Sequence, residues 1–221
     1  MTPLAAAVIV VVGCLAPPAL AHHVGSYTAR DNEVSTNFKQ IKFSLQAGKF
    51  DVALRLFEGG PLRKEMQTRA GRLPAGLESS TRAALRARDT KAAELDLALF
   101  VVALARDLAL EADRKLADGA APADARVAAG AKFLEAIWRY YNLVDFAITE
   151  RDSRTAVGIR LAFEEADGFT KPNGRTGTAP DPQRMRAPLQ RVAQLLGDFI
   201  QSAPTSSSPP TPPSVPTRRD S

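Results

Sequence analysis

Residues 91–118 read KAAELDLALFVVALARDLALEADRKLAD, and every residue from Leu97 to Ala105 is apolar. Leucine and alanine, which dominate the stretch, favour a helix over a strand. A helix that is apolar on all sides is expected to be buried among other helices. This stretch therefore predicts a long helix at the centre of a helical protein.

Segments on both sides of residues 91–118 also show helical periodicity. A second long helix is predicted from about residue 124 to residue 150, with a narrow polar stripe formed by Glu135, Arg139 and Asn142. Shorter helices are predicted over residues 33–46, 50–58, 153–167 and 187–202, with a proline- and glycine-rich loop at 168–187. We therefore expect five to seven helices in the chain.

Residues that cap helices mark the joints between the predicted helices. Asp31 or Asn32 precedes the first helix, Asp89 precedes the central helix, and Asp152 precedes the helix at 153–167. Such side chains accept hydrogen bonds from the free amides of a first turn. Asp89 and Asp152 are each preceded by arginine and followed by threonine or serine. This similarity indicates either an internal duplication or one capping chemistry that recurs where helices meet.

The first predicted hairpin contains the sequence GKFDVALRLF at residues 48–57. Phe50 follows Gly48 by two positions, and Ala53 follows Phe50 by three. This spacing resembles the centre of a tetratricopeptide unit, in which a glycine, an aromatic residue and an alanine shape the contact between two helices. The resemblance covers about residues 34–58 and implies an α-hairpin there.

These patterns together predict an all-α protein. Its antiparallel helical hairpins are expected to form a compact bundle or a short solenoid similar to tetratricopeptide proteins. The helical domain is assigned to residues 22–202 and begins with an extended arm at 22–32. Residues 203–221 are rich in proline, serine and threonine, and we expect them to form a disordered tail.

Residues 1–21 have the pattern of a cleavable export signal. An apolar run ends at Pro17-Pro18 and is followed by Ala19-Leu20-Ala21, a small-x-small cleavage site. The run is shorter than the about 20 apolar residues that a membrane-spanning helix needs. The chain is therefore predicted to be periplasmic or secreted, with no transmembrane span after cleavage. Lipidation at Cys14, which follows a small residue, is the alternative.

Cleavage after Ala21 would remove Cys14, the one cysteine, and leave His22 and His23 as the only histidines. A chain of this composition cannot use a thiol nucleophile, a thiolate metal site or a Ser-His-Asp triad. It also lacks a glycine-rich phosphate loop. The sequence therefore predicts a protein that is not an enzyme.

His22 and His23 would form the mature N-terminus. A free amine, a backbone amide and imidazoles are the tetragonal nitrogen ligands that Cu(II) and Ni(II) prefer. A set of helix carboxylates offers oxygen ligands for iron or another hard cation: Asp107, Glu111, Glu135, Asp145 and Glu150. The alternatives are a flexible arm without metal and carboxylates that pair with neighbouring arginines.

Two further groups of residues are candidates for binding. Basic side chains concentrate between residues 63 and 88, which we interpret as a solvated arginine-rich linker, although they could face an anionic partner or a membrane surface. No aromatic residues interleave with them, and nucleic-acid binding is not expected. Glu135, Trp138, Tyr141 and Asp145 could form a groove or an acidic cluster, but aromatic residues on so apolar a helix more often belong to the core. The phenylalanines of the first hairpin are interpreted as packing residues: Phe38, Phe43, Phe50 and Phe57.

The sequence leaves three functions to consider. The first is a non-catalytic binding or scaffold protein of the bacterial cell envelope that presents a helical groove to another envelope protein. The second is a periplasmic metal-handling accessory that uses His22, His23 and the helix carboxylates. An enzyme that uses carboxylates and tyrosines is the third.

The metal-handling function predicts that the mature chain, starting at His22, binds Cu(II) or Ni(II) one to one with sub-micromolar affinity. Replacing His22 and His23 with alanine should abolish this binding, because it removes both imidazoles. Calorimetric titration of a chain whose N-terminus has been verified by intact mass measures the effect. Affinity no higher than that of a generic histidine-containing peptide would contradict the metal-handling function.

Overall fold

The computed structural model describes residues 30–170 and 180–203, which form eight α-helices, one short 3₁₀-helix and no β-strand. The all-α prediction is confirmed. Residues 1–21, His22, His23 and the tail after Ala203 lie outside the described residues. The elements are α1 (Glu33–Gln46), α2 (Phe50–Gly59), α3 (Pro61–Thr68), η1 (Ala70–Arg72), α4 (Leu77–Ala87), α5 (Thr90–Ala117), α6 (Ala123–Arg151), α7 (Ser153–Gly168) and α8 (Arg186–Ser202).

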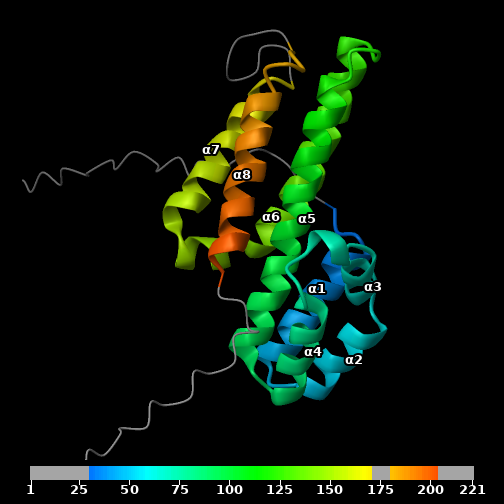
Figure 1. Ribbon diagram of the computed structural model, residues 1–221, viewed down its shortest axis with the longest axis vertical. Helices are drawn as coiled ribbons and strands as arrows, with labels where there is room; N and C mark the ends of the chain where they lie inside the picture. Colours follow the sequence, from blue (N-terminus) through cyan, green and yellow to red (C-terminus); the bar gives the residue numbers. More distant parts are fainter. Residues whose placement is uncertain (1–29, 171–179, 204–221) are drawn as a thin grey trace, which may run out of the picture.

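Four of these helices form an antiparallel bundle (Figure 1). Each of α5, α6 and α7 packs against the next helix in the chain, and α8 packs back against α5 and closes the bundle. Helices α1 to α4 gather at the other end of the molecule, where α4 and α1 contact α5. None of the described helices combines the length and apolar character that a membrane crossing requires.

Helix α5 is the predicted central helix. All side chains from Leu97 to Ala105 are buried, as their all-round apolar character predicts. Polar contacts also join α5 to its neighbours: for example, the Ser80 hydroxyl of α4 donates to buried Asp96 at 2.6 Å, and the Arg186 Nε of α8 donates to Asp113 at 2.7 Å. Burial by itself would raise the pKa of Asp113, but its hydrogen bond to Arg186 holds that pKa below the usual value.

The predicted helix caps are confirmed. Asn32, rather than Asp31, begins α1 in a reciprocal capping box with Ser35. The carboxylates of Asp89 and Asp152 each accept a hydrogen bond from a first-turn amide, of Ala92 and Thr155 respectively. Hydrogen bonds from the Thr155 hydroxyl and amide lower the pKa of Asp152. A short, capped joint at Asp152 reverses the chain and sets α7 beside α6.

The interpretation of residues 63–88 as a linker is wrong, because α3, η1 and α4 fold there. Both α-helices bury an apolar stripe that the run of arginines obscured in the sequence, and arginine is itself a good helix former. The buried apolar residues of these stripes are Leu62, Met66, Leu77, Ala84 and Leu85. The two extra helices also bring the total above the five to seven expected.

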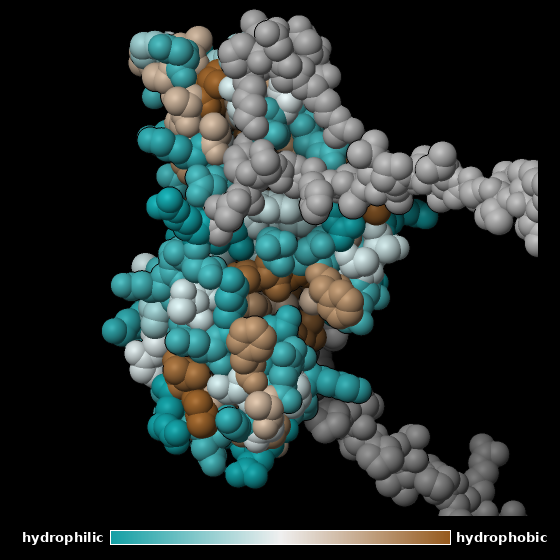
Figure 2. All heavy atoms as spheres, turned by 180° about the vertical axis from the view of Figure 1, so that it is seen from behind, coloured by the Kyte–Doolittle hydropathy of each residue, from teal (hydrophilic) through white to brown (hydrophobic). Residues whose placement is uncertain are grey.

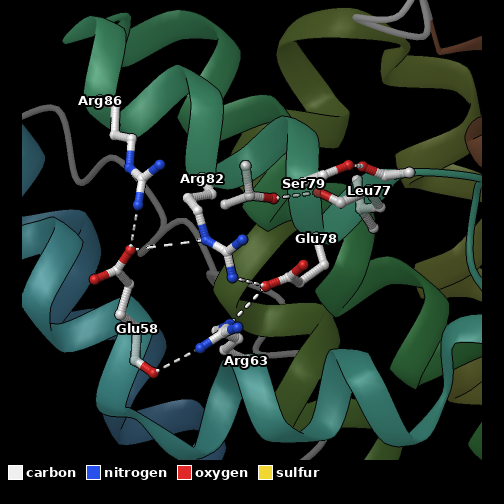
Figure 3. Close-up of polar contacts among 9 residues, drawn as sticks. Glu58, Arg63, Leu77, Glu78, Ser79, Arg82 and Arg86 are labelled. Carbon is white, nitrogen blue, oxygen red and sulfur yellow. Dashed lines mark hydrogen bonds and ion pairs between the residues drawn. The ribbon is translucent and has the colours of Figure 1, made fainter.

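Carboxylates neutralise several of these arginines (Figure 3). The Arg86 Nη2 donates to Glu58 at 3.0 Å, and Arg82 lies between Glu58 and Glu78, with its Nη2 2.6 Å from the Glu78 Oε1. Arg63 donates both to Glu78 and to the Glu58 carbonyl oxygen. This network connects α2, α3 and α4.

Asn37 and Gly60 fix the junction between α1, α2 and α3. The buried Asn37 amide donates to the Leu56 carbonyl oxygen at 3.1 Å and accepts from the Leu62 amide at 3.2 Å. Gly60 lies so close that a Cβ atom there would clash with the Leu56 carbonyl oxygen and with the Asn37 side chain. The Asn37 side chain therefore joins α1 to the backbone of α2 and α3, and the absence of a side chain at Gly60 leaves room for it.

We expect Gly60→Ala to lower the free energy of unfolding by about 2–4 kcal/mol, because the added methyl group displaces Asn37 from its two buried hydrogen bonds. Gly59→Ala is the matched control. A Cβ atom at Gly59 meets no atom within 4 Å, so this variant should be unchanged or more stable by up to ~1 kcal/mol. Urea unfolding measures both variants, and equal stabilities would contradict the proposed packing.

Candidate functional site

Two of the four predicted groove residues pack between α6 and α7. The Trp138 ring lies 4.9 Å from the Phe163 ring of α7 and 5.6 Å from the Tyr141 ring, measured between centroids. Tyr141 is only 1% exposed, and its hydroxyl donates to the Ala156 carbonyl oxygen at 3.2 Å. The aromatic residues thus join two helices, in agreement with the prediction that they belong to the core.

Asp145 lies beside these aromatic residues and pairs with Arg160 of α7. The Arg160 Nη2 and Nε donate to the two carboxylate oxygens at 2.6 and 3.0 Å. Burial, followed by the neighbouring Asp145 carboxylate, raises the pKa of Tyr141 above its ordinary range. Tyr141 therefore remains a neutral hydrogen-bond donor at physiological pH.

Glu135, the fourth predicted residue, lies on α6 with Arg139 as its ion-pair partner at 3.9 Å. The other candidate carboxylates are distributed along α5 and α6. Asp107 pairs with Arg106, whereas Glu111 and Glu150 are exposed. In the described part of the chain, no three histidine, cysteine, aspartate or glutamate residues are close enough to hold one metal ion.

An apolar groove lies between α1, α5 and the C-terminal half of α6. We call this the apolar groove, and its volume is about 140 Å³. A cavity of about 150 Å³ is large enough for benzene. The volume of the groove is therefore sufficient for one large apolar side chain. Its lining residues are Phe38, Lys42, Gln46, Glu94, Leu97, Ala98, Leu143, Val144, Phe146, Ala147 and Glu150.

Phe146 is the most exposed apolar residue of the groove, at 69%. Its neighbours Val144 and Ile148 face the core, so the period of α6 directs position 146 outward. Figure 2, which shows the molecule from behind, has hydrophobic side chains gathered in the middle of this face among hydrophilic ones. Large exposed apolar groups that border a concave surface often mark an interaction site.

Charged side chains border the apolar groove on three helices. Lys42 comes from α1, Glu94 from α5 and Glu150 from α6. None of the three forms a hydrogen bond or ion pair through its side chain within residues 30–170 and 180–203. The groove therefore combines an apolar floor with a border on which negative charge exceeds positive charge by one.

Sequence reasoning did not identify the apolar groove, because its residues come from three separate helices and meet only in the folded chain. One signal was present: Phe146 falls outside the buried stripe of α6. Phe43 was interpreted as a packing residue, and that is wrong, since it is exposed on the side of α1 opposite Ile41. For the apolar groove, the informative position was therefore Phe146, a large aromatic residue off the buried stripe of its helix.

We expect Phe146→Ala to change the free energy of unfolding by no more than ~0.5 kcal/mol, because the ring is mostly in water. Leu97→Ala, at the buried floor of the groove, should cost about 2–5 kcal/mol. Thermal and urea unfolding of the two variants measure this difference. A large loss of stability for Phe146→Ala would instead assign the ring to the core.

The chain matches no protein-family model, and neither a curated protein nor a solved structure is significantly similar to it.

Proposed function

We propose that the chain is a non-catalytic binding or scaffold protein of the bacterial cell envelope. In this proposal, residues 1–21 direct export and the apolar groove receives an apolar side chain of an envelope protein partner. The observation that supports it is the open groove with Phe146 exposed at its border. A buried anchor side chain surrounded by weaker contacts is the usual source of affinity in protein interfaces.

The apolar surface favours association. Complete burial of an exposed phenylalanine side chain is worth about 1.5–3 kcal/mol, and a partner side chain that fills the groove gains a similar amount. The helices that line the groove are held by the core of the molecule, because Phe38, Leu97 and Val144 are buried. A partner that binds to a preformed site of this kind does not have to offset the conformational entropy of ordering the lining residues.

The charges at the border favour a basic partner segment. Glu94 and Glu150 outnumber Lys42, and neither carboxylate forms an ion pair or hydrogen bond among the described residues. A lysine or arginine beside the anchor side chain would pair with them, and complementary charge adds specificity and raises the association rate. We therefore propose an occupant with one large apolar residue flanked by basic residues.

The groove residues that the sequence predicted on α6 show no arrangement suited to catalysis. Tyr141 is neutral and buried, and Asp145 is held by two hydrogen bonds to Arg160. A general acid or base needs a pKa near the working pH and access to a substrate. Tyr141 has a pKa raised by burial, and its hydrogen bond to the Ala156 carbonyl oxygen joins α6 to α7 instead.

Selection from a library of short random peptides on the immobilised chain tests this function. The enriched peptides should carry a large apolar residue with lysine or arginine within one helical turn. Phe146→Ala should weaken their binding at least about fivefold, which corresponds to about 1 kcal/mol, because it removes the exposed anchor contact. Glu94→Gln/Glu150→Gln should reduce the preference for basic residues.

Leu161→Ala is the matched control, because Leu161 is 60% exposed but lies on α7, outside the apolar groove. It should bind the selected peptides as well as the unmodified chain. Peptides that bind Phe146→Ala and Leu161→Ala with equal and undiminished affinity would place the binding surface elsewhere and overturn the proposal.

A further inference from the structure

A second cavity, lined mostly by arginines, lies between η1 and the middle of α5. Its lining residues are Arg72, Arg106, Asp107, Leu110 and Arg114, and its volume is about 410 Å³. We call it the arginine pocket. It shares no residue with the apolar groove. Arg106, Leu110 and Arg114 are spaced four residues apart and so occupy one face of α5.

Arg106 is fixed in position by two neighbours. Its Nε and Nη2 donate to the Asp107 Oδ1 at 3.1 and 2.8 Å, and its Nη2 also donates to the Arg72 carbonyl oxygen at 3.0 Å. The Nη1 forms no hydrogen bond with another described residue. A guanidinium that is already oriented loses less conformational entropy when it binds a ligand.

The acidic side chain in the pocket does not neutralise all of its arginines. Asp107 is 8% exposed and forms an ion pair with Arg106. Its Oδ2 lies 3.5 Å from the Nη1 of Arg69. Arg72 and Arg114 are exposed, and within the described residues neither side chain has a hydrogen bond or ion pair. The pocket thus contains an excess of positive charge and at least two guanidinium groups available to a ligand.

We propose that the arginine pocket binds a phosphate group of a phosphate ester. Arginine forks match phosphate oxygens with two parallel hydrogen bonds, and each bond to an ionised group is about twice as strong as a neutral one. Guanidinium groups from η1 and from successive turns of α5 suit a tetrahedral group with several acceptor oxygens better than a planar carboxylate. Leu110, which is 43% exposed, supplies an apolar contact for the esterified part of the ligand.

Two probes distinguish the two sources of a phosphate ester. Glycerol 3-phosphate represents a soluble ester, and phosphatidylglycerol vesicles represent a lipid headgroup, with phosphatidylcholine vesicles as the zwitterionic reference. NMR titration of the folded chain measures the first probe, and vesicle co-sedimentation measures the second. Saturable binding to either probe is expected, with shifts at Arg72, Arg106 or Arg114 for the soluble ester.

The variant Arg72→Gln/Arg114→Gln should weaken binding at least about tenfold, because it removes two charge-assisted contacts. Both side chains are exposed, so the fold is expected to remain, which circular dichroism checks. The control Arg55→Gln/Arg154→Gln removes the same net charge from exposed positions on α2 and α7 and should bind normally. Arg72→Lys/Arg114→Lys should recover part of the affinity, because it restores charge without the planar fork.

Equal weakening in the two glutamine variants would reveal a net-charge effect and overturn the proposal. Absence of saturable binding to both probes would overturn it as well. Vesicle binding that is lost in Arg72→Gln/Arg114→Gln, without binding of the soluble ester, would identify the lipid headgroup as the source. Binding of glycerol 3-phosphate that is lost in the same variant would identify a soluble ester.

Discussion

The apolar middle of α5 imposes the constraint on which the rest of the structure depends. Every side chain from Leu97 to Ala105 is buried, and one neighbouring helix can cover only one side of α5. Helices α6 and α8 cover part of its circumference, and α4 and α1 cover the other part near its N-terminal end. The bundle of α5 to α8 and the group of α1 to α4 therefore share one central helix.

Ion pairs between helices complement this apolar packing. Asp113 and Arg186 join α5 to α8, Asp145 and Arg160 join α6 to α7, and the network around Glu58 joins α2 to α4. Partly exposed pairs contribute little free energy each, so they orient helices whose stability comes from buried apolar surface. Most arginines on these helices pair with a carboxylate. Arg72 and Arg114 do not within the described residues, and they are therefore candidates for binding a ligand.

An interaction could be predicted from the sequence where both of its partners lie in one short segment. The caps at Asp89 and Asp152 could be predicted, because an aspartate and the amide three residues later are close in any helix start. The helices at residues 61–87 were missed, because arginines interrupt the apolar spacing of Leu77 and Leu85, and their neutralisation depends on carboxylates from another helix, such as Glu58. The packing of Tyr141 in the core and of Trp138 against it followed from their spacing, but the contact of Trp138 with Phe163 did not.

The sequence by itself determined that the chain is all-α, that α5 lies at the centre, and where most of its helices begin and end. Periodicity and capping act within a few residues, so they are encoded locally. The tertiary structure alone decided the position of the apolar groove and of the arginine pocket. Both combine side chains of α5 with side chains from other elements, and the packing of apolar faces, which is not directional, sets that arrangement.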